Sequence, residues 1–130
     1  MTKPLVVVSE QVRAAQAAGQ PVVALESTVI SHGLPYPHNL DLARAMEDVV
    51  RSGQATPATI GVVGGVPTVG MSDAQIEHFA QAKGILKLSQ RDIAYAIAMG
   101  RDGATTVAAT MALAAAGGIS VFATGGIGGV

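Results

Sequence analysis

Polar side chains follow several apolar segments of this chain, and Glu26 is the first of them. It comes directly after the apolar run 21–25, a pattern typical of a strand that is buried on both faces. An ionised carboxylate is costly there unless it is paired, and a carboxylic acid held there can donate a proton in catalysis. A glutamate that only accepts hydrogen bonds from loop amides explains the pattern equally well. The residue alone therefore leaves both roles open.

A second candidate is Lys87, which lies inside the short apolar segment 85–88. A lysine in such a strand can bind a phosphate or pair with a carboxylate. The alternative is an edge-strand lysine, whose charge discourages pairing with other chains. The local pattern favours neither of these roles over the other.

Two loops of small residues complete the candidate set. Segment 103–107 (Gly-Ala-Thr-Thr-Val) opens a predicted helix, and free amides at a helix N-terminus favour anions. Thr105 alternatively serves only as the cap of that helix. Segment 124–129 (Thr-Gly-Gly-Ile-Gly-Gly) lets backbone amides approach a ligand closely. It matches neither a Walker A motif nor GxGxxG, so by itself this loop is weak support for a binding site.

Hydrophobic periodicity and turn residues predict alternating strands and helices. Strands are expected at 21–25, 58–63, 85–88 and 119–123, with short runs at 4–8 and 66–69 as edge or hairpin strands. Helices are expected at 9–18, 39–52, 72–82, 89–99 and 105–116, and residues 27–37 as a loop. This alternation predicts an α/β fold with αβα layers around a mostly parallel or mixed sheet. In such folds ligands bind outside the carboxyl ends of the strands, which is where the candidate residues lie.

Two packing predictions follow from the apolar residues. Helix 39–52 is expected to bury one stripe of side chains at helical spacing, namely Leu40, Ala43, Met46, Val49 and Val50. Core positions are also expected for four of the methionines, which are Met46, Met71, Met99 and Met111.

Composition narrows the classes of partner. Charged residues make up only 13% of the 130 residues, and no basic stripe interleaved with aromatic residues occurs, which argues against a nucleic acid polymer as partner. No segment resembles a signal peptide or a membrane span. The absence of cysteine fits a reducing compartment, so we expect a cytoplasmic protein. The three histidines lack the spacing of a zinc site, and only His32 is expected near the candidate residues.

The last predicted strand runs into a glycine-rich loop that normally feeds a covering helix. We therefore expect residues 1–130 to be the N-terminal portion of a single α/β domain.

Five segments together resemble the pseudouridine-5'-phosphate glycosidases, also described as the indigoidine synthase A-like family. They are VALESTVISHGLP at 23–35, PATI at 57–60, KLSQRD at 87–92, GATTVAAT at 103–110 and VFATGGIGGV at 121–130. The likeness extends over nearly the whole chain and keeps the order of the motifs. These motifs are long and share little with other sugar-phosphate enzymes.

The resemblance implies reversible cleavage of the C–C glycosidic bond of pseudouridine 5'-phosphate to uracil and ribose 5-phosphate. In the family a lysine forms an imine with the ribose C1' and a glutamate acts as the acid, unlike glycosidases with two carboxylates. Position by position, Glu26 matches the proton donor and Lys87 the substrate-binding lysine. Val107, with Thr106 beside it, lies in a segment that contacts substrate. The loop that lines the site in the family corresponds here to Thr124, Gly125 and Gly126.

The resemblance also implies groups that this chain lacks. The family's metal-binding Asp, typically a Mn²⁺ ligand, its Ser-Ala-Asp segment and its imine-forming Lys all lie beyond the position of residue 130. We therefore expect the chain alone to be inactive, and a full-length protein to be a homotrimer. The alternatives are a non-catalytic module that binds sugar phosphates or nucleotides, and a structural fragment supported by a partner.

Overall fold

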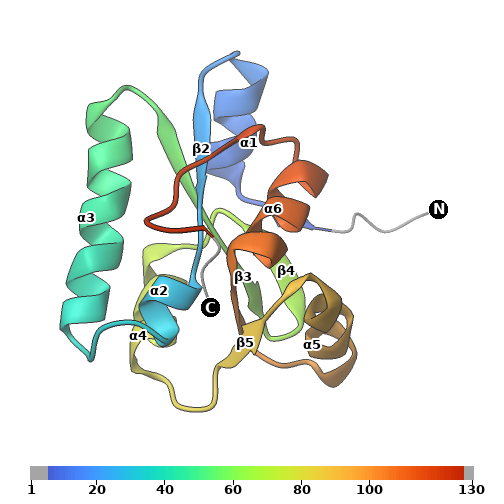
Figure 1. Cartoon of the computed structure of the whole chain (residues 1–130). Coiled ribbons are helices and arrows are strands. Elements are labelled where there is room, and N and C mark those ends of the chain that lie inside the picture. Colours follow the sequence, from blue (N-terminus) through green and yellow to red (C-terminus); the bar gives the residue numbers. More distant parts are fainter. Residues whose placement is uncertain (1–5, 128–130) are drawn as a thin grey trace.

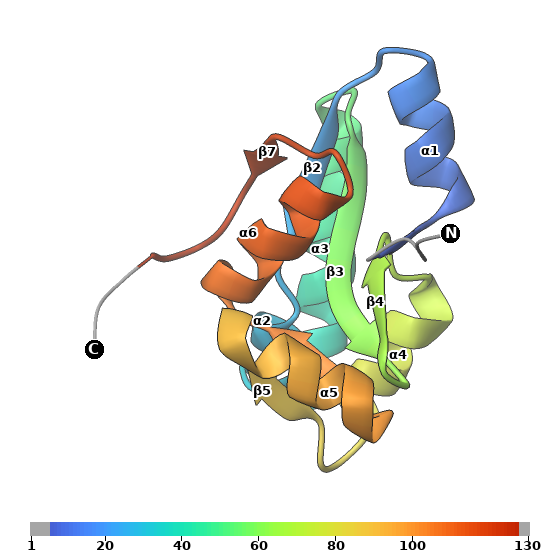
Figure 2. The same ribbon diagram turned by 90° about the vertical axis from the view of Figure 1, so that its right-hand side faces the viewer.

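The computed structural model describes residues 6–127, which form a mixed sheet with helices on both faces (Figures 1 and 2). The predicted α/β class and layered architecture are confirmed. The strands are β1 (Val7–Val8), β2 (Val22–Leu25), β3 (Thr56–Val63), β4 (Val66–Val69), β5 (Leu86–Leu88), β6 (Gly103–Thr105) and β7 (Val121–Phe122). The helices are α1 (Glu10–Ala17), α2 (Thr28–Ser31), α3 (His38–Ser52), α4 (Asp73–Gln81), η1 (Gln90–Asp92), α5 (Ile93–Met99) and α6 (Val107–Ala116).

Strand β3 organises the sheet. Along the order β1-β4-β3-β2-β7, β3 pairs in parallel with β2 and antiparallel with β4. The continuous apolar character of β2 and β3 follows from burial on both faces, as expected for central strands. Strand β6 pairs antiparallel with β3 and in parallel with β5.

Two hydrophobic clusters lie on opposite faces of this sheet. Helices α1, α5 and α6 pack on one face over Ile60 and Val62 of β3. Helices α2, α3 and α4 pack on the other face, around Phe79 and Ala104. Figures 1 and 2 show α3 and α6 on opposite sides of the β2–β3 pair.

Several predicted elements need correction. The expected loop 27–37 contains the one-turn helix α2, whose Ile30 is buried in the second cluster. The helix expected from residue 89 begins as the 3₁₀ turn η1 before α5. The last strand is only two residues long and Val121 is 55% exposed, so it is no buried strand. Residues 4 and 5 of the predicted first strand and residues 128–130 of the last loop lie outside the described residues.

The buried stripe of α3 is also different from the predicted one. Leu40 and Ala43 are buried as expected, but the next buried residue is Glu47, while Val49 is 70% exposed. Glu47 is accommodated because Thr59 donates a 2.7 Å hydrogen bond to its carboxylate and Arg51 pairs with the other oxygen at 3.0 Å. Of the four methionines, Met71 is buried, whereas Met99 and Met111 are more than half exposed.

Candidate functional site

The carboxyl ends of β2 and β6 meet at one edge of β3. Strand β2 pairs with the first half of β3, up to the Leu25–Thr59 pair. Strand β6 pairs with the second half through Gly61 and Val62, running in the opposite direction. The two strands therefore point their carboxyl ends at each other, and the residues that follow them are brought together beside Ile60.

Glu26 is the first residue after β2, and it is half-buried. The hydroxyl of Thr124 donates a short hydrogen bond to Glu26 Oε1. The amide of Gly126 donates to the same hydroxyl oxygen at 3.3 Å. The structure thus brings the predicted acid into contact with the predicted loop after β7, across 98 residues of sequence.

Lys87 lies in β5, with its side chain exposed to solvent. It pairs with Ala104 of β6, and Ala104 belongs to the cluster under α2 and α4, so Lys87 faces that side of the sheet. Among residues 6–127 it forms no hydrogen bond or ion pair, with Glu26 or with any other residue. The ligand role of Lys87 stays a prediction, as does its convergence with Glu26 on one ligand.

Thr106, rather than Thr105, caps the helix that follows β6. Its hydroxyl accepts a 3.5 Å hydrogen bond from the Ala109 amide, and α6 begins at Val107. Thr105 belongs to a strand and is fully buried. The prediction of a helix start at Thr105 is therefore wrong by two residues. The prediction that segment 103–107 leads into a helix N-terminus is confirmed, and Thr106 and Val107 at that end are half-buried.

Sequence reasoning missed three buried hydroxyl residues that join these strand ends, namely Ser27, Thr105 and Thr110. Ser27 Oγ accepts a 2.8 Å hydrogen bond from the Thr105 amide, so it links the loop after β2 to the end of β6. Their presence inside the motifs at 23–35 and 103–110 was the available signal, because Ser27 directly follows Glu26 and Thr105 directly precedes Thr106. The neighbouring Thr28 Oγ1 is buried without a hydrogen-bond partner among residues 6–127.

An apolar groove of about 400 Å³ lies beside Thr124. Its walls are the end of β2, one face of α3 and the start of the loop after β7. The residues that line it are Leu25, Leu42, Ala45, Met46, Val49, Val50, Ala123, Thr124 and Gly125. Met46, Val49 and Val50, which were predicted to be buried in the core, therefore line this open groove.

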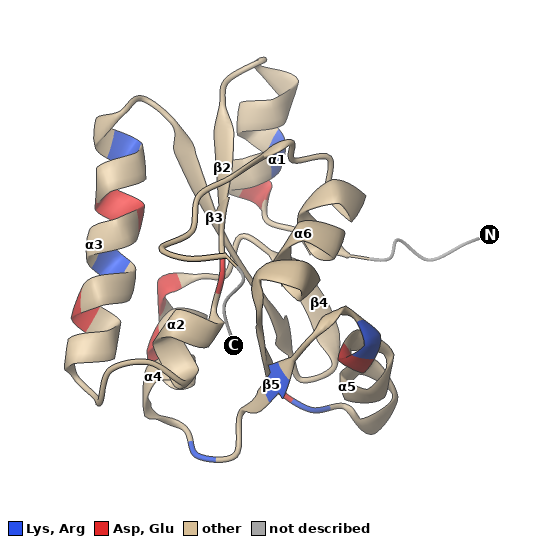
Figure 3. Cartoon of the chain, in the orientation of Figure 1, with Lys and Arg blue, Asp and Glu red and all other residues tan. Residues whose placement is uncertain are grey.

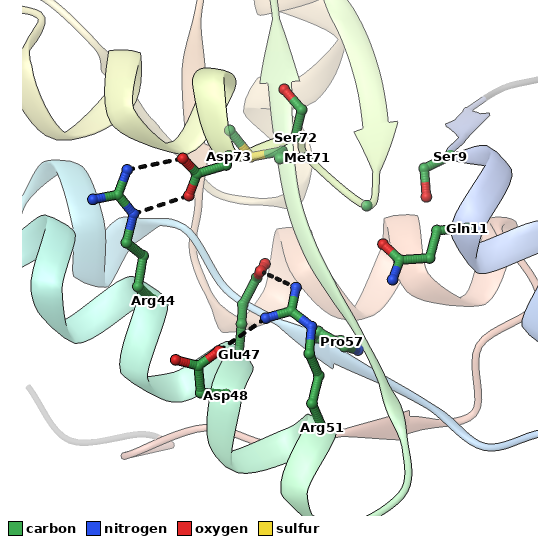
Figure 4. A pocket seen from close by; sticks show the side chains of 11 residues that line it. Ser9, Gln11, Arg44, Glu47, Asp48, Arg51, Pro57, Met71, Ser72 and Asp73 are labelled. Carbon is green, nitrogen blue, oxygen red and sulfur yellow. Dashed lines mark hydrogen bonds and ion pairs between the residues drawn. The ribbon is translucent and has the colours of Figure 1, made fainter.

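A second hollow, of about 500 Å³, lies between α1, α3 and the β3–β4 hairpin and shares no residue with the predicted site (Figure 4). Its charges are mutually paired. Arg44 donates two hydrogen bonds to Asp73, and this contact holds the pKa of the Asp73 carboxyl below its usual range. Arg51 is bonded to both Glu47 and Asp48. This pairing leaves no evident group for chemistry.

The histidine and carboxylate side chains of this part of the chain are too dispersed to form a metal site. Residues 6–127 hold no cluster of three or more His, Asp or Glu side chains able to bind a metal ion. His78 bonds to Asp102 at 2.7 Å, and His32 caps α2 at an exposed position. The described residues therefore do not fit a Mn²⁺ site.

None of the helices in this part of the chain has the length and apolar character needed to cross a bilayer.

Charge is distributed unevenly over the elements, as Figure 3 shows. Helix α3 carries both signs, whereas α6 carries no charged residue. With its strand-end carboxylate, adjacent helix N-terminus and glycine-rich loop, the chain belongs to the class of α/β proteins with a polar strand-end site.

The comparisons with known proteins define the family. The model of the family described as indigoidine synthase A like protein matches residues 11–130, and the chain belongs to this family. A pseudouridine-5'-phosphate glycosidase from Herpetosiphon aurantiacus is 65% identical over the whole chain, and one from Roseiflexus sp. is 66% identical over 96% of it.

Solved structures agree with this assignment. The prealnumycin C-glycosynthase AlnA, solved in complex with ribulose 5-phosphate, has a TM-score of 0.86 at 47% identity and covers 99% of this chain. An indigoidine synthase A-like protein from Thermotoga maritima has a TM-score of 0.84 at 34% identity and covers the whole chain. The chain spans 42% and 41% of the length of the two glycosidase relatives, and 41% and 43% of the two solved chains.

Proposed function

We propose that this chain contributes the proton donor and part of the substrate-binding wall of a pseudouridine-5'-phosphate glycosidase. The overall reaction is addition of water to pseudouridine 5'-phosphate, which gives uracil and ribose 5-phosphate. The relatives at 65% and 66% identity carry this name. The contact between Glu26 and Thr124 is the single observation in the structure that best supports the proposal, because it places an acid against the loop after β7.

Among residues 6–127, Glu26 is the only acidic residue that directly follows a strand. In the proposed role its carboxyl group gives a proton to the uracil carbon as the C–C bond breaks, so the leaving group departs as neutral uracil. The Thr124 hydroxyl donates to Oε1 and fixes the orientation of the carboxyl group. This leaves the second oxygen, Oε2, available to carry the transferred proton.

The remaining candidates are assigned to substrate binding. The N-terminus of α6 at Thr106 and Val107 presents backbone amides and the positive end of the helix dipole, which favour a phosphate or another anion. Lys87 supplies a mobile positive charge near β6. Gly125 and Gly126 lack side chains, and no heavy atom lies within 4 Å of a Cβ built on either, so a ligand can approach their backbone.

Other properties are proposed for a full-length protein through the resemblance. They are dependence on Mn²⁺, assembly as a homotrimer and a cytoplasmic location. The metal ligands would have to come from outside residues 6–127, because this part has no suitable cluster. Uracil release before and after treatment with a chelator, and sedimentation of the assembled protein, test the first two.

The experiment uses a chimera in which residues 1–130 are fused to the part of the Herpetosiphon aurantiacus relative that follows its matched portion. We expect the chimera to release uracil from pseudouridine 5'-phosphate. Glu26→Gln should lower turnover at least about 100-fold, the typical contribution of a general acid. The variant keeps an oxygen that can accept from Thr124, so ribose 5-phosphate binding should change little.

Two outcomes would contradict the proposal. Turnover of the Glu26→Gln chimera within threefold of the unmodified chimera would remove Glu26 from the acid role. Saturable binding of ribose 5-phosphate by an unmodified chimera that releases no uracil would favour the binding module instead.

A further inference from the structure

Three fully buried hydroxyl groups form a cluster where β2 and β6 meet. Ser27, Thr105 and Thr110 are each 0% exposed. Thr105 Oγ1 lies 2.8 Å from the Ile60 carbonyl oxygen, 2.8 Å from Thr110 Oγ1 and 3.2 Å from Ser27 Oγ. The Thr105 amide donates to Ser27 Oγ at 2.8 Å. The cluster therefore joins β2, β3, β6 and α6 at one point.

Its hydrogen positions follow from the groups present. The Ile60 carbonyl can only accept, so the Thr105 hydroxyl donates to it. Thr105 Oγ1 is then free to accept, and the hydroxyls of Thr110 and Ser27 donate to it. Ser27 Oγ in turn accepts from the Thr105 amide. Every polar group in the cluster is satisfied, as burial requires.

The backbone is anchored on both sides of Glu26, by strand pairing before it and by the cluster after it. On one side, Leu25 is held in register with Thr59. On the other side, the Ser27 carbonyl accepts from the amides of Ile30 and Ser31, while its hydroxyl is bonded to Thr105. Glu26 is the single residue between these two anchored positions. The backbone position from which its side chain extends is therefore fixed relative to β6.

The other candidate residues are anchored from the same point. Thr106 follows Thr105 directly, and its amide donates to the Leu88 carbonyl at 3.0 Å. Leu88 in turn follows Lys87 in β5. Glu26, Lys87 and Thr106 are thus each one residue away from a position that this bonded network holds.

We infer that Ser27, Thr105 and Thr110 are positioning residues, which hold Glu26 at a fixed place relative to Thr106 and the N-terminus of α6. The inference deepens the proposed function and rests on it. Apolar residues of similar size would fill the same volume without needing partners, so a cluster of three mutually bonded hydroxyls marks a place where orientation matters.

The kinetic test uses the chimera with Thr105→Val, which keeps the shape but removes the hydroxyl. Misplacement of a reacting group by about 1 Å costs on the order of 100-fold in rate, so we expect kcat to fall by about 10- to 100-fold. KM should stay within threefold. Thr105→Ser should restore kcat to within threefold, because it keeps the hydroxyl. The matched control is Thr56→Val at the half-buried far end of β3, which should leave both constants unchanged.

A general loss of structure is excluded by measuring the folded fraction of each chimera at the assay temperature. If Thr105→Val does not fold, Thr110→Val takes its place, since it removes only the outer donor of the cluster. A kcat for the folded valine variant within threefold of the unmodified chimera would overturn the inference. So would a serine variant as slow as the valine variant.

A second measurement separates this inference from the proposed function. Amide NMR shifts of Glu26 and Thr106 are compared in the 130-residue chain and in its Thr110→Val and Thr56→Val variants. We expect both signals to move in Thr110→Val and neither to move in Thr56→Val. Unmoved signals in Thr110→Val would overturn the positioning role. An inactive unmodified chimera would instead contradict the proposed function, and the NMR result would still decide the positioning role.

Discussion

Leu25 and Ser27 lie on either side of Glu26, yet their surroundings are opposite in kind. Ser27 belongs to the buried hydroxyl cluster, in which each polar group has a partner from this same chain. Leu25 lines the apolar groove along α3, where Val49 is 70% exposed. The hydroxyl cluster around Ser27 is closed to solvent, whereas the apolar groove beside Leu25 is open to solvent. Apolar sequence therefore does not by itself mark the core here, and polar sequence does not mark the surface.

The largest effect is expected from removing a hydroxyl group from the buried cluster. In the 130-residue chain, Thr105→Val leaves the Ile60 carbonyl without its side-chain donor and the Thr110 hydroxyl without its acceptor. The free energy of unfolding should fall by about 2–3 kcal/mol, which is the upper range for unsatisfied buried groups. Urea unfolding followed by circular dichroism measures it. A loss below about 0.5 kcal/mol would mean that the cluster contributes little to folding.

A somewhat smaller effect is expected from crowding the cluster. A Cβ at Gly61 would lie 2.8 Å from Met71 Sδ, 3.1 Å from Phe79 Cε2 and 3.3 Å from Ser27 Oγ. Gly61→Ala should therefore destabilise the chain by about 1–2 kcal/mol, as overpacked sites do. Gly125→Ala is the control, because its Cβ meets no atom within 4 Å. Equal unfolding midpoints for the two variants in urea would contradict the tight packing described around Ser27.

A half-buried polar cluster at η1, formed by Ser89 and Asp92, adds a pH-dependent contrast to the buried hydroxyl cluster. The Ser89 hydroxyl and amide both donate to Asp92, and they lower the pKa of this carboxyl below its usual range. Ionised Asp92 therefore stabilises the folded chain above about pH 4, and this contribution is lost as pH falls through the lowered pKa.

The thermal midpoint of Asp92→Asn should thus lie below that of the unmodified chain at pH 6, and the two should converge near pH 2. A difference that is constant with pH would contradict the assigned cause. The hydroxyl cluster has no titrating group, so the destabilisation by Thr105→Val should not change over the same range.

The smallest effect is expected in the open apolar groove along α3. Val49→Ser removes an apolar side chain that is already 70% exposed, so the free energy of unfolding should change by no more than about 0.5 kcal/mol. Val62→Ala, at a fully buried valine of β3, should cost more than about 1 kcal/mol and serves as the contrast. A loss at Val49 equal to that at Val62 would show that the groove is closed in solution.

The sequence predicted the layers, most elements, and Glu26 and the loop after β7 as candidates at the strand ends. The predicted buried stripe of α3 was wrong because two sets of residues on this helix have the same spacing. Residues 40, 43 and 47 have the same helical spacing as residues 43, 46 and 50. The first stripe is the buried one, and the bonds from Thr59 and Arg51 to Glu47 allow its carboxylate to be there. The hydroxyl cluster escaped notice because it depends on β2 and β6 meeting head to head, a long-range arrangement that local periodicity does not contain.

Amide hydrogen exchange at Thr105, resolved by NMR, tests most directly whether the end of β2 is held to the end of β6. The Thr105 amide donates to Ser27 Oγ inside a fully buried cluster, so it should exchange only through global unfolding, as slowly as the central amides of β3. Exchange as fast as that of the exposed loop amides near Gly125 would contradict the account.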